Sequence, residues 1–221
     1  SGKKEKAKRL IKKAYESGCW AVKFQFRADD FFAINDEMGS TLIRDELYKS
    51  SFDVNWISEL IDYSKSLKLK IGFSFFRERD LLDFFKNKKH KIDFIKIPSP
   101  EFRNLRLIKS AKKFAPLMIS YGGGSEKEIK KYIKLSELNE NDVIFHCISN
   151  YPTSLGNQQL NFLKKLKNYS KALIGYSSHD AQWEINIIAA QYGISFIERH
   201  LCESKKDQGL DISTSSTPDE F

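Results

Sequence analysis

Residues 171–200 read KALIGYSSHDAQWEINIIAAQYGISFIERH, and this stretch shows the repeating unit of the fold. The apolar runs at 171–176 and 194–199 predict two short strands, and segment 181–192 between them has the 3.6-residue periodicity of a helix. Strands joined through a helix lie parallel in one sheet. Polar residues mark the ends of both strands, with Ser-Ser-His-Asp after the first and Arg-His at the end of the second.

The same unit recurs along the chain. Strands are predicted at residues 20–26, 69–74, 92–97, 116–120, 142–147, 171–176 and 194–199. Helices are predicted at residues 3–17, 54–68, 78–87, 103–114, 125–135, 157–167 and 181–192. A long excursion at 27–53, with a helical piece around RDELYK, interrupts the alternation once. Seven strands that alternate with helices predict an α/β fold with a parallel sheet.

Two architectures contain such a sheet, the doubly wound open sheet and the (β/α)8 TIM barrel. In an open sheet only the strands at the switch point carry polar residues at their carboxyl ends, whereas in a barrel all strand ends meet at one mouth. Polar residues follow nearly every predicted strand, so we expect a single TIM-barrel domain over residues 1–221. Because the sequence opens with a helix and stops where a last helix could start, we expect this barrel to lack its first strand and last helix.

The composition excludes several classes of protein. No apolar run is long enough to span a membrane, and the start SGKKEKAKRL lacks the apolar core of a secretory signal. The net charge is +8, but most lysines fall on predicted helix faces without interleaved aromatic residues, so nucleic-acid binding is not expected. Cys19, Cys147 and Cys202 form no CxxC motif, which indicates reduced thiols in a cytoplasmic protein.

Two lysines are predicted to point into the barrel. Side chains alternate along a strand, so Lys23 and Gln25 face inward if the apolar residues of strand 20–26 pack on the helices, and Lys96 faces inward from strand 92–97. Two buried lysines repel each other unless an anion neutralises them, which favours a bound phosphate or carboxylate. The alternative is a salt bridge within the chain, with Glu101 or Glu198 as the partner.

Small hydroxyl side chains follow several other strands. One serine at the start of a loop is ordinary turn chemistry, but five at successive strand ends, beside two inward lysines, are typical of a phosphate site. These five residues are Ser74, Ser99, Ser120, Ser149 and Ser177.

Two histidines are predicted at the ends of neighbouring strands. His179 and His200 face inward by the same alternation, and adjacent strands lie about 4.8 Å apart, so both imidazoles can reach one divalent ion. Glu101 could add a carboxylate, a donor set that suits Mn²⁺, Fe²⁺, Co²⁺ or Zn²⁺ better than Ca²⁺. The alternative is a pair of hydrogen-bonded core histidines. Tyr151 is predicted to overhang the same mouth from a Tyr-Pro loop, and Asp211 belongs to a polar tail that folds over it.

Five motifs resemble the sialic acid synthase family, the N-acetylneuraminate synthases and their legionaminic and pseudaminic acid relatives. The motifs are AVKFQ (21–25), IKIPSPE (95–101), HCISNYPT (146–153), GYSSHD (175–180) and IERHLCESKKDQGLDISTSSTPDEF (197–221). They follow the order of the family across nearly the whole chain. The resemblance implies a catalytic TIM barrel in a cytoplasmic homodimer. It also implies condensation of phosphoenolpyruvate with N-acetylmannosamine, or a related amino sugar, to a nine-carbon 2-keto sugar acid and phosphate.

The resemblance also implies roles for individual residues. The residues that match the phosphoenolpyruvate binders are Lys23, Ser74, Lys96, Ser99, Ser149 and Ser177. His179 and His200 match the ligands of a divalent metal, with Mn²⁺ expected and Mg²⁺ or Co²⁺ as alternatives. The residues that match sugar-side or catalytic positions are Gln25, Glu101, Tyr151 and Asp211.

The sequence departs from the family pattern at several points. The usual Asp before the first metal histidine is Ser178, and the usual Lys before the second is Arg199. The usual Thr-Pro-Phe loop reads Ser-Phe-Phe at 74–76, and the usual Ser-Thr-Gly loop reads Ser-Tyr-Gly at 120–122. The family's first-strand Glu and its C-terminal antifreeze-like domain are not in this sequence. These departures leave two alternatives, a truncated or non-catalytic homologue that binds a sugar phosphate or a protein partner, and a synthase of a shorter keto sugar acid.

Overall fold

The computed structural model describes residues 3–28, 45, 47–48 and 53–221, and its centre is one parallel sheet. Eight strands follow the order of the chain, each paired with the next: β1 (Ala21–Gln25), β2 (Lys70–Ser74), β3 (Phe94–Ile97), β4 (Leu117–Tyr121), β5 (Val143–Cys147), β6 (Leu173–Ser178), β7 (Phe196–Leu201) and β8 (Ser215–Ser216). All seven pairings are parallel. This topology confirms the predicted α/β barrel class.

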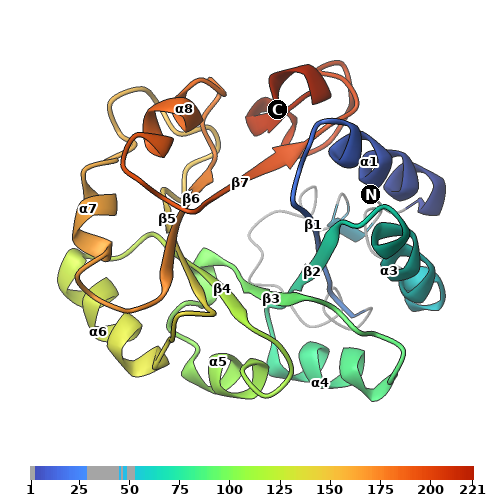
Figure 1. Ribbon diagram of the computed structural model, residues 1–221, viewed down its shortest axis with the longest axis horizontal. Coiled ribbons are helices and arrows are strands. Elements are labelled where there is room, and N and C mark those ends of the chain that lie inside the picture. Colours follow the sequence, from blue (N-terminus) through green and yellow to red (C-terminus); the bar gives the residue numbers. More distant parts are fainter. Residues whose placement is uncertain (1–2, 29–44, 46, 49–52) are drawn as a thin grey trace.

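Helices surround the strands, as Figure 1 shows. They are α1 (Lys4–Glu16), α3 (Ile57–Ser66), α4 (Glu78–Lys86), α5 (Leu105–Ala111), α6 (Glu126–Ser136), α7 (Phe162–Leu166) and α8 (Ile185–Ala190). The described residues also form short turns of 3-10 helix: η3 (Val54–Trp56), η4 (Ser99–Glu101), η5 (Ile212–Thr214) and η6 (Pro218–Glu220). Their sequences show why they form. In α1, for example, Ala7, Ile11 and Ala14 recur at helical spacing and are buried.

The sheet is open between its first and last strands. Among the described residues β1 pairs only with β2, and β8 pairs only with the His200–Leu201 end of β7. The C-terminal segment and α1 lie beside each other at this gap (Figure 1). Arg9 donates to both carboxylate oxygens of Glu203 at 2.8 and 3.1 Å, and the Ser17 hydroxyl donates to the Pro218 carbonyl at 3.1 Å. Side chains therefore connect the two edges that the strands leave unpaired.

The core has two parts, one on each side of the strands. The large outer cluster lies between the strands and the helices and includes Ile71, Ile95 and Tyr176. The small inner cluster fills the lower part of the barrel with Phe94, Met118, Val143 and Phe145, and Ala21 and Phe196 pack against it. Because this apolar plug occupies the amino-terminal half of the interior, inward-facing polar residues are confined to the carboxyl ends of the strands.

The structure corrects the predicted elements in three places. All seven predicted strands are present, but an eighth, Ser215–Ser216, was not predicted because two serines give no apolar run. β6 and β7 end two residues later than expected, so Ser177 and His200 lie within strands rather than after them. The excursion 27–53 falls largely outside the described residues. No helix in the described part of the chain is long and apolar enough to cross a membrane.

Candidate functional site

The register of the sheet brings the predicted polar residues to one level of the barrel. Gln25 is aligned with Ser74, which is aligned with Lys96 on β3. On the other side of the barrel Ser177 on β6 is aligned with Glu198 on β7. Side chains at aligned positions of a parallel sheet share a face, so these residues all point inward above the apolar plug.

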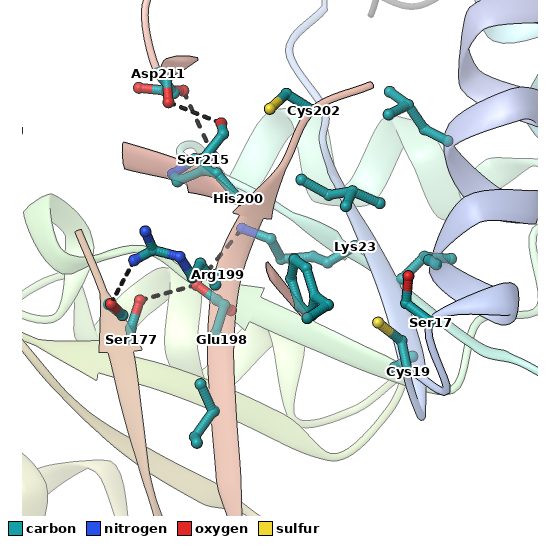
Figure 2. Close-up of a pocket in the computed structure, with 18 of the residues that line it drawn as sticks. Ser17, Cys19, Lys23, Ser177, Glu198, Arg199, His200, Cys202, Asp211 and Ser215 are labelled. Carbon is teal, nitrogen blue, oxygen red and sulfur yellow. Dashed lines mark hydrogen bonds and ion pairs between the residues drawn. The ribbon is translucent and has the colours of Figure 1, made fainter. Parts of the chain in front are cut away.

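Lys23 and Lys96 converge on a single oxygen of Glu198. The Lys96 ammonium donates to Glu198 Oε1 at 2.7 Å, and Lys23 Nζ lies 3.8 Å from the same atom. Ser177 adds a hydrogen bond to Oε1 at 3.0 Å. Figure 2 shows Lys23 and Ser177 approaching Glu198 from opposite sides. The salt-bridged alternative therefore describes this structure, with Glu198 as the partner, and anion binding by the two lysines stays a prediction.

The electrostatics of this cluster reflect its burial. Lys96 is 2% exposed, and the side chains of Lys23 and Glu198 are 20% and 21% exposed. Burial alone would raise the pKa of Glu198, but the charges of Lys23 and Lys96 and the hydrogen bonds to it hold that pKa well below its ordinary value. Burial lowers the pKa of Lys23, and the Glu198 charge opposes this shift. The carboxylate therefore provides a negative charge between the two lysines inside the barrel.

The predicted serines divide into three groups. Ser120 accepts a 2.7 Å hydrogen bond from Lys96, and Ser177 binds Glu198, so both belong to the lysine cluster. The Ser99 and Ser149 hydroxyls lie 3.1 Å apart and bind each other. Ser74 is fully buried, and its hydroxyl has no hydrogen-bond partner among the described residues. An unpaired buried hydroxyl at this level is a polar group that a ligand or water could satisfy.

His179 and His200 form one cluster of rings with Tyr151. The two imidazole centroids are 5.7 Å apart, and the Tyr151 ring lies 4.1 Å from His179 and 6.4 Å from His200. His179 Nδ1 is 3.1 Å from the Ile148 carbonyl, which can only accept, so Nδ1 carries the proton and Nε2 keeps its lone pair. Burial lowers the pKa of His179 to about 4 and also lowers the pKa of His200. Both imidazoles are therefore neutral at pH 7, as metal ligands must be.

The structure brings Asp211, rather than Glu101, to the histidines. Asp211 Oδ2 is 3.7 Å from His200 Nδ1, whereas the Glu101 carboxylate accepts a 3.0 Å hydrogen bond from Asn104. Within the described residues no group of three or more His, Cys, Asp or Glu side chains is arranged to hold a metal. The imidazole pair fits a divalent ion in its donor chemistry, and substrate oxygens and water would have to complete the coordination.

A cavity of about 1430 Å³ runs along the open side of the barrel and reaches this cluster. The predicted site residues that line it are Lys23, Gln25, Ser177, His179, His200 and Asp211. Glu198 lines it as well. Tyr151 stands at the mouth with 52% of its surface exposed, and the peptide bond between Tyr151 and Pro152 is cis.

Three residues behind the histidines were not predicted to take part in the site. Asp180 is fully buried and accepts hydrogen bonds from Tyr176 at 2.7 Å and from Ser178 at 2.9 Å. Arg199 donates to Ser178 at 2.8 Å. Strand alternation contained a signal for them, because Ser178 and Arg199 each precede an inward histidine and must therefore face outward.

The comparisons with known proteins agree in sequence and in structure. The model of the NeuB family matches residues 10–221. The chain is 31% identical over 219 residues to an uncharacterized protein of Methanocaldococcus jannaschii, covering 97% of this chain and 62% of that protein. It is 28% identical over 231 residues to an N-acetylneuraminate-9-phosphate synthase of Drosophila melanogaster, covering 98% and 61%. The chain thus spans less than two thirds of the length of these two relatives.

Solved structures show the same fold. The N-acetylneuraminic acid synthetase of Leptospira borgpetersenii, in complex with citrate, superimposes with a TM-score of 0.86 at 23% identity and covers 98% of this chain and 74% of that one. A spore coat polysaccharide biosynthesis protein of Bacillus subtilis gives a TM-score of 0.80 at 27% identity, with coverage of 99% and 61%. Together with the family match, these findings confirm the resemblance seen in the motifs: the chain belongs to the NeuB family, the sialic acid synthases and their legionaminic and pseudaminic acid relatives.

Proposed function

We propose that this chain is the catalytic barrel of a phosphoenolpyruvate-dependent synthase that makes a nine-carbon 2-keto sugar acid of the sialic acid type. One observation carries the proposal, the convergence of Lys23 and Lys96 on one point of the barrel interior, below two neutral imidazoles on neighbouring strands. Such a condensation has two reactants. The anionic one would bind at that point, and the carbonyl compound would bind near the imidazoles. The relatives named as sialic, legionaminic and pseudaminic acid synthases support the class of product.

The lysines and hydroxyls would bind phosphoenolpyruvate. Lys96 and Ser177 already donate to one negatively charged oxygen that also forms an ion pair with Lys23, and a phosphate or carboxylate of the substrate offers the same kind of acceptor. Ser74, whose buried hydroxyl is unpaired in the described structure, and the Ser99–Ser149 pair would supply further donors. Fixed donors of this kind hold the enol in one orientation and stabilise the charge that develops on the departing phosphate.

The amino sugar would lie above, between the imidazole pair and the residues at the mouth. A divalent metal held by His179 and His200, with Mn²⁺ expected and Mg²⁺ or Co²⁺ as alternatives, would polarise the aldehyde oxygen of the sugar. Gln25 and Asp211 line the cavity and would bind sugar hydroxyls, with Tyr151 covering them from the loop. Glu101 would take part only if its carboxylate left Asn104.

The overall chemistry joins two carbon skeletons and releases phosphate. Carbon 3 of phosphoenolpyruvate forms a bond to the aldehyde carbon of N-acetylmannosamine or a related N-acyl amino sugar. Water then adds to carbon 2, and the tetrahedral intermediate loses phosphate to leave the 2-keto acid. Residues 1–221 would act as one catalytic domain in a cytoplasmic homodimer.

The test is phosphate release from phosphoenolpyruvate with purified chain, N-acetylmannosamine or the diacetylated amino sugars of legionaminic and pseudaminic acid, and Mn²⁺, Mg²⁺ or Co²⁺. We expect release that requires both sugar and metal, and loss of release in the His179→Ala/His200→Ala double variant. His90→Gln, which changes a histidine bound to the Phe84 carbonyl instead, is the matched control and should stay active. Absence of release with every sugar and metal would overturn the proposal.

A further inference from the structure

The carboxylate of Glu198 occupies the point at which an anion would bind. Its Oε1 atom accepts from Lys96 at 2.7 Å and from Ser177 at 3.0 Å, and Lys23 Nζ is 3.8 Å away. These donors come from β1, β3 and β6, so the carboxylate is surrounded from three directions. A ligand that is to bind both lysines therefore has to compete with a side chain that already binds them.

The charges of the cluster determine which ligands can displace Glu198 from the lysines. Two ammonium groups and one carboxylate together carry a net positive charge of one, and the site is partly buried away from water. A ligand with one negative charge that displaces Glu198 from the lysines only exchanges one carboxylate-like partner for another, and it leaves Glu198 without its cations. A ligand with two or three negative charges gains more attraction to the lysines than Glu198 gives up, because Coulomb energy scales with the product of the charges.

We propose that Glu198 is a specificity-determining residue, an internal counter-ion that admits multiply charged anions to the lysine pair and rejects singly charged ones. The proposal rests on the proposed function, since it takes the lysine pair as the phosphoenolpyruvate site. Phosphoenolpyruvate carries a phosphate and a carboxylate, so it belongs to the admitted class. Monocarboxylates, including a pyruvate-like fragment without phosphate, belong to the rejected class.

The surroundings of Glu198 allow it to move when an anion arrives. Its side chain is 21% exposed and lines the cavity, whereas Lys96 is 2% exposed and is anchored by Ser120 at 2.7 Å. The carboxylate can therefore rotate into the cavity while the lysines stay in place.

The experiment compares anion binding in the full chain and in Glu198→Gln, which removes the charge and keeps the shape. Isothermal titration calorimetry at constant pH and ionic strength would use sulfate as the dianion, phosphoenolpyruvate as the substrate, and acetate as the monoanion. We expect sulfate and phosphoenolpyruvate to bind about ten-fold more tightly or better to the variant, and acetate to bind measurably only to the variant.

Glu203→Gln is the matched control, because this substitution removes the same charge as Glu198→Gln. The Glu203 side chain is 21% exposed, as is that of Glu198, and it pairs with Arg9, away from the lysine pair. It should leave all three affinities within about two-fold of the original chain, which removes general charge effects as an explanation. Lys96→Met should abolish sulfate binding in both backgrounds and thereby locate the measured site.

Weaker or unchanged sulfate binding in Glu198→Gln, or an unchanged preference for dianions over acetate, would overturn the proposal. If circular dichroism shows that Glu198→Gln does not fold, Glu198→Asp replaces it, since the shorter carboxylate withdraws from the lysines and should give intermediate affinities.

Anion binding is measured without turnover, so the experiment distinguishes failure of the proposed function from failure of the proposed role of Glu198. A chain that binds phosphoenolpyruvate as expected but releases no phosphate contradicts the proposed function alone, and an active chain whose Glu198→Gln variant binds anions normally contradicts this inference alone.

Discussion

Arg199 donates from Nη1 to the Ser178 hydroxyl at 2.8 Å, on the side of β6 and β7 opposite to His179 and His200. Each of these two residues directly precedes one histidine. The hydrogen bond therefore joins the outer faces of the two strands at the level where the imidazoles lie on the inner face. Arg199 also donates from Nε to Ser216 at 2.6 Å, and Ser178 donates to the buried Asp180. A polar network on the outer side of β6 and β7 therefore joins the two strands at the level of the histidines.

Removal of this network should loosen the proposed metal site without changing either histidine. We expect Ser178→Ala to weaken binding of Mn²⁺ by about ten-fold, because partners behind the ligands typically contribute this much to metal affinity. Titration calorimetry with Mn²⁺ alone would measure it. Ser66→Ala, which removes a hydroxyl bonded to the Tyr63 carbonyl at the exposed end of α3, is the control and should leave the affinity unchanged. Equal affinities in the two variants would show that the strands hold the histidines unaided.

The apolar plug predicts a second effect, on stability. Gly72 is aligned with Phe94, and a Cβ atom at Gly72 would lie 2.2 Å from the Phe94 ring. We expect Gly72→Ala to lower the free energy of unfolding by about 1–3 kcal/mol, since the aromatic ring must leave its place in the core. The double variant Gly72→Ala/Phe94→Leu should recover part of this loss in urea denaturation. A double variant whose loss equals the sum of the two single losses would contradict the direct contact.

Acid should destabilise the fold through its buried histidines. Burial lowers the pKa of His146, whose Nε2 donates to the Gln158 carbonyl at 2.8 Å, and burial also lowers the pKa of His179 and His200. Below pH 6.5 these histidines take up protons in the unfolded chain but not in the folded chain. The stability that the neutral histidines contribute above pH 6.5 is therefore lost as the pH falls toward 5. Each such histidine contributes up to about 1.4 kcal/mol per pH unit.

The variant His146→Phe isolates one of these histidines. It should have a shallower decline of unfolding free energy between pH 6.5 and 5, because one proton fewer is taken up on unfolding. Urea denaturation at several pH values measures the slope. Identical slopes for the variant and the original chain would mean that folding does not lower the pKa of His146.

The three thiols should differ in reactivity. Cys147 is 1% exposed, and burial raises its pKa to about 11, while Cys202 is 3% exposed and Cys19 is only half-buried. The thiolate is the reactive form, so iodoacetamide at pH 8 should label Cys19 first and leave the other two until the chain unfolds. Peptide mass spectrometry reads the order, with Cys19→Ser as the control. Labelling of Cys147 at a rate near that of Cys19 would contradict the burial of its thiol.

Much of the fold could be predicted from the sequence because strand alternation encodes it locally. The inward placement of Lys23, Lys96, His179 and His200 followed from period-two patterning within single strands. The pairing of Glu198 with both lysines could be named only as an alternative, because whether a carboxylate or a ligand fills a charged cavity depends on rotamers and distances across the barrel. The network of Ser178, Asp180 and Arg199 was missed because its members face a helix layer whose packing no local pattern describes. The strand at 215–216 was missed because its pairing depends on one end of β7 and not on apolar residues.

The ion pair between Lys23 and Glu198 also has a consequence for biosynthesis. The two residues lie near opposite ends of the chain, and the contacts of Arg9 with Glu203 and of Ser17 with Pro218 join the same distant segments. During translation Lys23 and Lys96 leave the ribosome long before Glu198 is made, so the ion pairs that join these residues can form only after β7 has been synthesised.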